Sequence, residues 1–354
     1  MILPWISTSV PLPIVPTELL KRYHVHERHD TRFRSCARLL QALWLSDRAI
    51  PVGVHRGRRA SRKLGSRLTP SAALAGRNFL SPELAELAHR LVAYQEPGAF
   101  LDYDRVLGNG LSSTTMCINL MGTLALDLDL AACVLRIVMP DMDIAHVDAV
   151  RFEHSPGRGS STLTGDRSAF DACVFLTLRS DAGTAPRRCV IAIETKYTEG
   201  LHESGPCEPG RYDDLAEASG LFREPYHAAL RVNPLQQLFR EHLLAQAAVM
   251  RGDWPLAVFM SVAPAANERV QRQADLYTAF LNPTLEGQVP FVHVTLDAFV
   301  AALEFAGAPA AAALYDRYLD FTKIDRLVDA ALKQRVAHWP TAIRKSRSLK
   351  LIGA

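Results

Sequence analysis

Two apolar segments separated by a short polar turn constrain the fold of this chain more than any other feature. Residues 169–178 (AFDACVFLTL) and 188–197 (RCVIAIETKY) are rich in Val, Ile, Phe and Leu, and both are too short for typical helices. Between them, residues 180–186 (SDAGTAP) include the Gly and Pro that favour a turn. The pattern therefore predicts an antiparallel β-hairpin.

The charged residues of this hairpin face each other if the turn centres on Ala182 and Gly183. In that register residue 171 lies directly opposite Glu194, and opposed residues have Cβ atoms roughly 4.5–5.5 Å apart. Strand periodicity places Lys196 on the same face as Glu194, and Thr195 on the other face. A shift of one residue would break this arrangement, so the prediction depends on the turn.

Asp171 and Glu194 would repel each other on one face of the hairpin unless a cation lies between them. Their spacing suits shared coordination of Mg²⁺, whose oxygen ligands lie at about 2.0–2.1 Å. An exposed polar face, with Lys196 neutralising the two acids, is the alternative that the strand pattern leaves open. The apolar character of both strands disfavours that alternative, because a charge on such a strand is costly without a partner.

The order of these residues resembles the PD-(D/E)xK phosphodiesterase superfamily, which has the restriction-endonuclease-like fold. Asp171, Glu194 and Lys196 stand at the motif positions, with Phe170 in place of the proline. Within the superfamily, the chain resembles a poorly characterised bacterial group over roughly residues 100–260. The matching segments are 112–120 (SSTTMCINL), 152–156 (FEHSP), 168–171 (SAFD), 193–199 (IETKYTE) and 233–240 (NPLQQLFR).

The resemblance implies a metal-dependent nuclease that hydrolyses phosphodiester bonds in DNA, with a role in restriction or defence as an analogy. It implies Mg²⁺ as the cofactor, with Mn²⁺ as a substitute. Asp171 and Glu194 would bind the metal, together with the backbone carbonyl of Thr195. Lys196 would orient the attacking water or stabilise charge on the phosphate.

The resemblance also implies a further catalytic acid, Glu153, just before the core sheet. Sequence leaves open whether Glu153 ends a helix or lies on the first strand. A surface carboxylate near Arg151 and Arg158 is the alternative interpretation of this residue.

The pattern of residues 233–250 predicts a helix, in which two polar residues are spaced so that their side chains project together. Asn233 suits the N-cap and Pro234 the first helical position. The apolar stripe consists of Leu235, Leu238, Phe239, His242 and Leu243. Gln237 and Arg240 are i,i+3 neighbours and project together. In related nucleases a glutamine on this helix helps to position the site or a strand phosphate, so we expect Gln237 and Arg240 to contact nucleic acid. A solvated helix face is the alternative.

The remaining pattern predicts an α/β fold, with a mixed central sheet flanked by helices. Helical patterns cover residues 17–48, 81–95 and 113–135, and residues 50–70 form a basic, Gly-containing loop. After the 233–250 helix come a strand at 254–262, a helix at 264–281, a strand at 291–294, a helix at 296–305 and a helical C-terminal part. We expect an N-terminal helical extension over residues 1–100, packed on a nuclease-like domain over residues 101–354.

Composition bounds the partners and the compartment. The net charge is only +3, so a nucleic-acid enzyme would need a local basic groove, to which the basic runs 56–63 and 344–347 could contribute. The 6 cysteines lack zinc-site spacing, and nothing indicates secretion, so we expect a cytoplasmic protein. The apolar run 120–139 is interrupted by Asp127 and Asp129, so we expect no membrane partner. RNA as the substrate, and a homodimer, remain open.

Two other classes of function compete with the nuclease. One is a catalytically inactive nucleic-acid-binding or assembly module of the same fold, which would have no need of the clustered acids. The other is a metal-dependent enzyme with a non-nucleic substrate, which a closed small pocket at Asp171 would favour. A basic groove leading to Asp171 would favour DNA.

Overall fold

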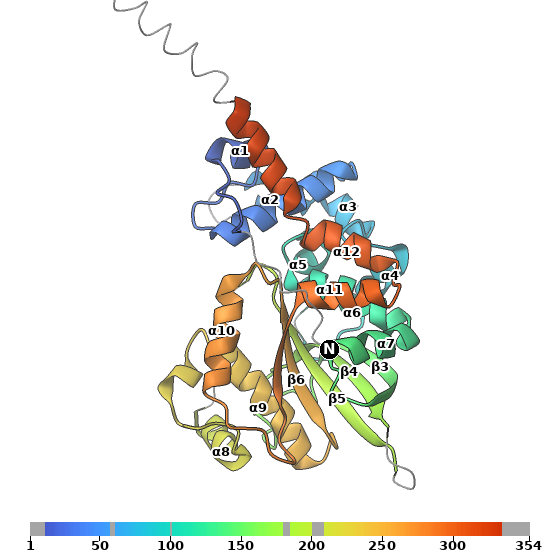
Figure 1. The fold of residues 1–354 in the computed structure, drawn as a ribbon, viewed down its shortest axis with the longest axis vertical. Helices are drawn as coiled ribbons and strands as arrows, with labels where there is room; N and C mark the ends of the chain where they lie inside the picture. The colour runs from blue at the N-terminus through green and yellow to red at the C-terminus, as the bar shows by residue number, and fades with distance from the viewer. Residues whose placement is uncertain (1–10, 57–60, 100, 180–184, 200–208, 335–354) are drawn as a thin grey trace, which may run out of the picture.

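A mixed five-stranded sheet with helices on both faces occupies the lower half of the molecule in Figure 1, below the N-terminal and C-terminal helices. The computed structural model describes residues 11–56, 61–99, 101–179, 185–199 and 209–334. The strands follow one another across the sheet in chain order: β3 (Ile144–His154), β4 (Phe170–Leu178), β5 (Arg187–Thr195), β6 (Ala257–Ala263) and β7 (Phe291–Thr295). The pairs β3–β4 and β4–β5 are antiparallel, and β5–β6 and β6–β7 are parallel. The predicted α/β architecture is confirmed.

The helices precede, interrupt and follow the sheet. The ones before it are α1 (Thr17–Arg22), α2 (Arg32–Asp47), α3 (Pro70–Leu74), α4 (Pro82–Ala93), α5 (Tyr103–Gly108), α6 (Ser113–Leu126) and α7 (Leu128–Val138). Between and after its last strands lie α8 (Pro209–Ser219), the 3₁₀ turn η1 (Ala228–Arg231), α9 (Gln236–Arg251), α10 (Glu268–Ala279), α11 (Leu296–Phe305), α12 (Ala310–Tyr318) and a helix over residues 322–334.

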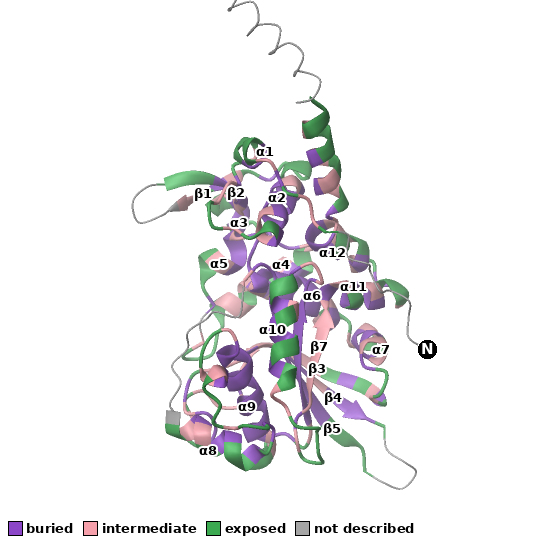
Figure 2. Ribbon diagram, turned by 60° about the vertical axis from the view of Figure 1, so that its left-hand side comes forward, coloured by how far each residue is buried: buried purple, intermediate pink, exposed green. Residues whose placement is uncertain are grey.

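The central strand β5 is buried on both faces, which explains its nearly continuous apolar sequence. Ile191 and Ile193 belong to the core beneath α6, α7 and α11, whereas Val190 and Ala192 belong to the core beneath α9. Figure 2 shows α9 as almost entirely buried and α10 as largely exposed. Glu194 continues the alternation toward the α9 side, so the fold brings this acid against α9.

The register of the β4–β5 hairpin is the predicted one. Ala172 pairs with Ile193 and Cys173 with Ala192. This is the register expected for a turn centred on Ala182–Gly183, although that turn itself lies outside the described residues. Continuing the register by one residue places Asp171 opposite Glu194.

A second, two-stranded sheet lies where a basic loop was expected at residues 50–70. β1 (Val52–Arg56) pairs antiparallel with β2 (Ser61–Leu68). The loop prediction was wrong because the basic side chains of β2 occupy its exposed first half, which hides the strand pattern; residues 64–66 are buried. Residues 57–60 of the basic run, like the run 344–347, lie outside the described residues.

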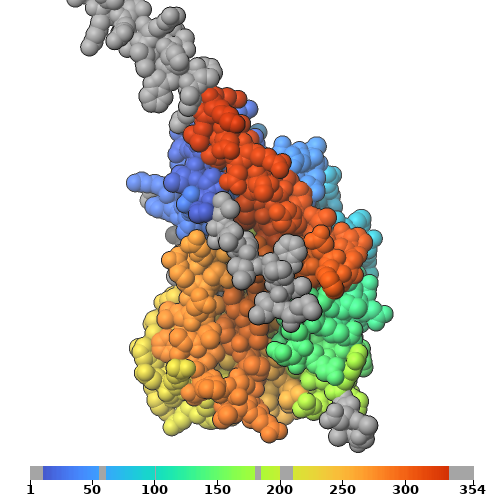
Figure 3. Space-filling view, in the orientation of Figure 1, coloured from blue at the N-terminus to red at the C-terminus, as the bar shows by residue number. Residues whose placement is uncertain are grey.

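The N-terminal and C-terminal parts of the chain lie side by side (Figure 3), and a buried arginine joins them. Arg317 on α12 is 0% exposed, and its guanidinium donates to the Gln41 side chain on α2 and to the Asn78 carbonyl and side chain. The same guanidinium lies 4.0 Å from the ring centroid of Trp44. The extension expected over residues 1–100 and its boundary stay predictions; apolar residues of α2 share one core with those of the sheet.

Two predicted helices are each split in the structure. The 17–48 pattern splits into α1 and α2, with Thr31 capping α2 through the Arg34 N–H. The 113–135 pattern splits into α6 and α7, because the Asp127 side chain accepts from the Leu130 N–H and starts a new helix.

No single described helix is long and apolar enough to cross a membrane, although α6 and α7, bent by 116°, meet that test as a pair.

The helix expected from Asn233 begins later, at Gln236. The predicted N-cap was wrong because the chain first makes a turn, in which the Val232 carbonyl accepts from the N–H groups of Leu235 and Gln236. The apolar stripe is confirmed, since all five of its residues are buried. Gly252 ends α9 with a left-handed φ of 86°.

Candidate active site

A row of polar residues crosses all five strands in one register. Glu194 pairs with Ser261, and Ser261 pairs with His293. On β3 and β4, the residue pairs before and after Glu153 place this glutamate opposite Asp171. Asp171 in turn lies opposite Glu194 on β5. Three adjacent strands therefore each contribute a carboxylate to the same edge of the sheet.

Glu194 is held by one cation and one amide. Its Oε1 lies 2.9 Å from Nζ of Lys196 and accepts a 2.7 Å hydrogen bond from Nε2 of Gln237 on α9. Glu194 is 4% exposed and Lys196 is 2% exposed, so this ion pair is shielded from water. The structure thus brings together the strand pair and the helix glutamine that the sequence predicted.

A fourth acid, Glu241, joins this group from the next turn of α9. Gln237 Nε2 also donates to Glu241 Oε1, at 2.9 Å, and Glu241 is buried. In the described part of the chain, Oε2 of Glu241 and Oε1 of Gln237 are buried acceptors without a donor. Sequence reasoning missed Glu241, although its i,i+4 spacing from Gln237 was the signal that could have found it.

The buried acids carry an unfavourable charge balance. Burial raises the pKa of Asp171, and it raises the pKa of Glu194 well above its usual value, with the charges of Asp171 and Glu241 adding to the effect. Burial likewise raises the pKa of Glu241 to about 8. The Lys196 ammonium lowers the pKa of all three acids, but one lysine cannot neutralise them together.

The Asp171 carboxylate is turned toward Thr195. Its Oδ2 accepts from the Thr195 N–H at 2.9 Å and from the Thr195 hydroxyl at 2.6 Å. The sequence did not predict this contact, because strand periodicity places Thr195 on the opposite face from Glu194. Thr195 is the last residue of β5, where the ladder to β4 has ended, so its N–H takes a side-chain acceptor.

Glu153 lies near the end of β3, which settles the choice between helix and strand. Its φ is 47°, an uncommon value for a residue with a side chain. Its carboxylate lies 3.3 Å from the Arg158 guanidinium. Glu153 and Asp171 both line a cavity of about 10 Å³, close to the volume that one water needs, together with residues of α4 and α6.

Arg240 is 9% exposed and lies one helical turn from Gln237. Its positive charge acts to lower the pKa of two neighbours, Glu241 and Tyr212. Among the described residues, Nε of Arg240 is buried without a hydrogen-bond partner. Gln237 therefore reaches the acids, whereas Arg240 lies beside them as a buried cation on the α8 side.

A model of the PD-(D/E)XK nuclease superfamily matches residues 28–320, which is more than half of the chain. The chain belongs to the PD-(D/E)XK nuclease superfamily. No curated protein and no solved structure gave a significant match. The match begins between α1 and α2, so the β1–β2 hairpin and the helices from α2 onward in the N-terminal region fall within the span of this superfamily model.

Members of the PD-(D/E)XK superfamily typically use divalent metals. Within the described residues, no three His, Cys, Asp or Glu side chains converge as a ready-made metal site. The atoms that could bind a metal here fit a hard cation, because they are carboxylate and amide oxygens. The two buried acceptors without donors, on Glu241 and Gln237, are the structural observation that supports this fit.

Proposed function

We propose that this PD-(D/E)XK protein is a Mg²⁺-dependent nuclease that hydrolyses phosphodiester bonds in DNA. The observation that carries the proposal is the group of the buried Glu194 and Glu241 and the half-buried Asp171 near the single ammonium of Lys196. Burying several carboxylates near one another is costly without a cation. A binding module gains nothing from this arrangement, whereas a metal-dependent hydrolase requires it.

Asp171 and Glu194 would hold the metal, with the Thr195 carbonyl as a further ligand and Mn²⁺ as a substitute ion. When bound, the ion would polarise the scissile phosphate and lower the pKa of a water molecule. Glu153, which shares a water-sized cavity with Asp171, would hold water on the β3 side. Hydrolysis then joins the water oxygen to phosphorus with loss of one of its protons and breaks the P–O ester bond, and the leaving oxygen takes up one proton, so the protons balance.

Lys196 and Arg240 would have different tasks. Lys196 Nζ is fixed at 2.9 Å from Glu194, beside the metal ligands, where charge changes most during reaction. Arg240 is a planar cation whose Nε has no hydrogen-bond partner in the described part of the chain, which suits a strand phosphate. We therefore assign turnover to Lys196 and strand affinity to Arg240.

We also place the protein in a reducing cytoplasm, supported by the free thiols of the five described cysteines.

The test is incubation of circular and linear DNA with Mg²⁺ or with EDTA, followed by a gel. We expect cleavage with Mg²⁺ alone, and cutting of the circle would establish endonuclease action. Glu194→Gln retains an oxygen for Lys196 but removes the charge, and it should be inactive. The matched control is Glu304→Gln, which changes an exposed glutamate on α11. Near wild-type cutting by Glu194→Gln would mean that the site is misassigned.

A second measurement separates the two cations. Binding is followed by fluorescence anisotropy with Ca²⁺ in place of Mg²⁺, and turnover is followed with Mg²⁺. Lys196→Ala should lose turnover far more than binding, whereas Arg240→Ala should weaken binding and flatten its salt dependence. The opposite outcome would make Lys196 a substrate clamp and Arg240 the catalytic group.

A further inference from the structure

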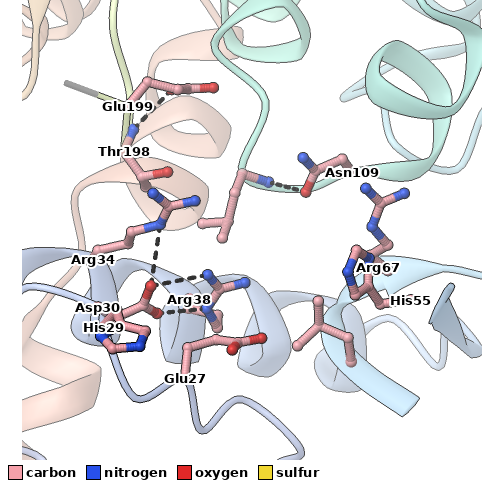
Figure 4. A pocket seen from close by; sticks show the side chains of 12 residues that line it. Glu27, His29, Asp30, Arg34, Arg38, His55, Arg67, Asn109, Thr198 and Glu199 are labelled. Atoms are coloured by element: carbon pink, nitrogen blue, oxygen red, sulfur yellow. Dashed lines mark hydrogen bonds and ion pairs between the residues drawn. The ribbon is translucent and has the colours of Figure 1, made fainter. Parts of the chain in front are cut away.

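A polar cavity of about 350 Å³ lies between the N-terminal region and the end of β5. Its walls come from the loop before α2, from α2 itself, from the β1–β2 hairpin, from the loop before α6, and from residues 198 and 199. Figure 4 shows His55 and Arg67 on one side of it, across from Arg34 and Thr198. Nothing in the proposed catalytic chemistry uses this cavity.

The acids that line the cavity already have partners. Asp30 accepts from Arg38 at 2.7 and 3.1 Å, and it lies 3.2 Å from the Arg34 Nε. Glu27 pairs with Arg62 on β2. Glu199 accepts backbone N–H groups at the start of α6 and just after β5, including that of Ser113 at 3.1 Å. No lining carboxylate is therefore left to attract a metal ion or a basic ligand.

The side chains of Arg67, His55 and Thr198, which line the cavity, can all donate hydrogen bonds. In the described parts of the chain, no hydrogen bond or ion pair engages the side chain of Arg67 or of His55. The backbone bridge of Arg67 to Asn109 fixes the position of that residue. Thr198 is 7% exposed, and its hydroxyl is buried without a partner in that same part of the structure. Donors without acceptors indicate a ligand that brings acceptors, such as a phosphate.

The cavity and the active site share one edge of the sheet. Thr198 follows Lys196 by two residues, so their Cα atoms are at most about 7.6 Å apart. Arg105 connects the two sites, because its guanidinium lies 3.8 Å from Glu199 and its charge lowers the pKa of Asp171. A nucleic-acid strand with its scissile phosphate at Asp171 would reach the cavity within about two nucleotide steps, at 3.4 Å per step along a strand.

The size of the cavity limits what enters it. A compact space of this volume is about 7 Å across, and it lies at the small end of ligand pockets, which hold about 300–1,000 Å³. A duplex does not fit, since its major groove alone is about 12 Å wide. One unpaired nucleotide fits, with its phosphate against Arg67 and Thr198 and its base beside the His55 imidazole.

We propose that this cavity binds one unpaired nucleotide of the substrate strand, next to the scissile phosphate, so that the protein prefers single-stranded DNA or single-stranded ends. The proposal rests on the proposed nuclease function for its geometry. Its test is a binding measurement without metal, in EDTA, so it does not depend on whether the protein cleaves.

The experiment measures fluorescence anisotropy of a labelled 12-nucleotide oligothymidylate and of a blunt hairpin duplex, at several salt concentrations. Arg67→Ala should weaken binding of the single strand about tenfold and reduce the salt slope by about 0.7, the value for one lost phosphate contact. Thr198→Val should weaken it less. The matched control is Arg272→Ala, an exposed arginine on α10 that pairs with Glu268. Circular dichroism confirms that each variant is folded.

Three outcomes would overturn the inference. The first is equal single-strand binding by Arg67→Ala and Arg272→Ala. The second is duplex binding as tight as single-strand binding, with the same loss in Arg67→Ala. The third is competition by free thymidine monophosphate as effective as competition by the 12-mer, which would make the cavity a site for free nucleotides. Failure of the nuclease proposal looks different, because binding would depend on Arg67 while no substrate is cut with Mg²⁺.

Discussion

The substitution Glu241→Gln tests the charge balance of the buried acids in the metal-free protein. The carboxylate has a folded pKa of about 8 against an ordinary 4.5, so the folded protein retains a proton that the unfolded chain loses. Stability from this proton is complete below about pH 4.5 and is lost as the pH rises toward 8. Glutamine mimics the protonated acid at every pH, and its amide oxygen can still accept from Gln237.

The magnitude follows from linkage. One proton held only by the folded state lowers the free energy of unfolding by about 1.4 kcal/mol per pH unit. Between pH 5.5 and pH 7.5 the wild type should therefore lose roughly 3 kcal/mol that the variant keeps. Removing the charge of Glu241 also lowers the pKa of Glu194, which flattens the pH profile further.

The assay is urea unfolding of both proteins in EDTA at several pH values, with Glu304→Gln as the surface control. The stability of Glu241→Gln should exceed that of the wild type at pH 7.5 and approach it near pH 5.5. Parallel pH profiles for the two proteins would refute the reasoning, because Glu241 would then be ionised in the folded state and paired with Lys196. A flattening found only in Glu194→Gln would assign the extra proton to Glu194.

Other perturbations follow from the same contacts. Asp171→Asn should abolish Mg²⁺-dependent cleavage on a gel while its metal-free melting temperature holds or rises, because it removes a proposed metal ligand together with a repelling charge. Thr195→Val should lower the free energy of unfolding, measured with urea at neutral pH, by about 1–2 kcal/mol, since Asp171 loses its 2.6 Å hydroxyl donor. Thr195→Ser, which retains the hydroxyl, should lower it less. Equal losses in the two variants would show that packing and not the hydroxyl matters. Arg317→Ala should lower the free energy of unfolding, measured with urea, by roughly 3–5 kcal/mol, because it leaves a buried cavity and removes the donor to Gln41 and Asn78. A loss under about 1 kcal/mol would contradict that role.

The strand part of the candidate site could be predicted from sequence because it depends on local pattern. The apolar alternation and the turn fix the hairpin register, and the register places Asp171 opposite Glu194 with Lys196 one side-chain period away. The hydrogen bonds from Thr195 to Asp171 could not be predicted in the same way. They depend on the point at which the ladder between β4 and β5 ends, and strand periodicity contains no information about that point.

The contributions of distant segments were harder to predict. Gln237 reaches Glu194 across 43 residues of sequence, and a resemblance, not a pattern, pointed to that contact. Glu241 followed from helix spacing but had no motif to draw attention to it. The cavity at Arg67 and Thr198 is assembled from five separate segments, one of which has strands where the charged sequence indicated a loop. Sequence can predict what one element presents to its neighbours, but not which loops close around a common space.

The hydrogen bonds between Gln41 and Arg317 have a consequence for how the protein is made. These residues are 276 positions apart, so the N-terminal helices emerge from the ribosome long before their partner. At about 5–20 residues per second, the wait is on the order of 15–55 s. During that time β2 can already pack on α2, but the part of α2 that α12 covers, with Gln41 in it, has no native cover. Contacts of such large separation form slowly. A chaperone or the ribosome surface would have to shield α2 until α12 arrives, so incomplete chains should be prone to aggregation and should lack a finished core.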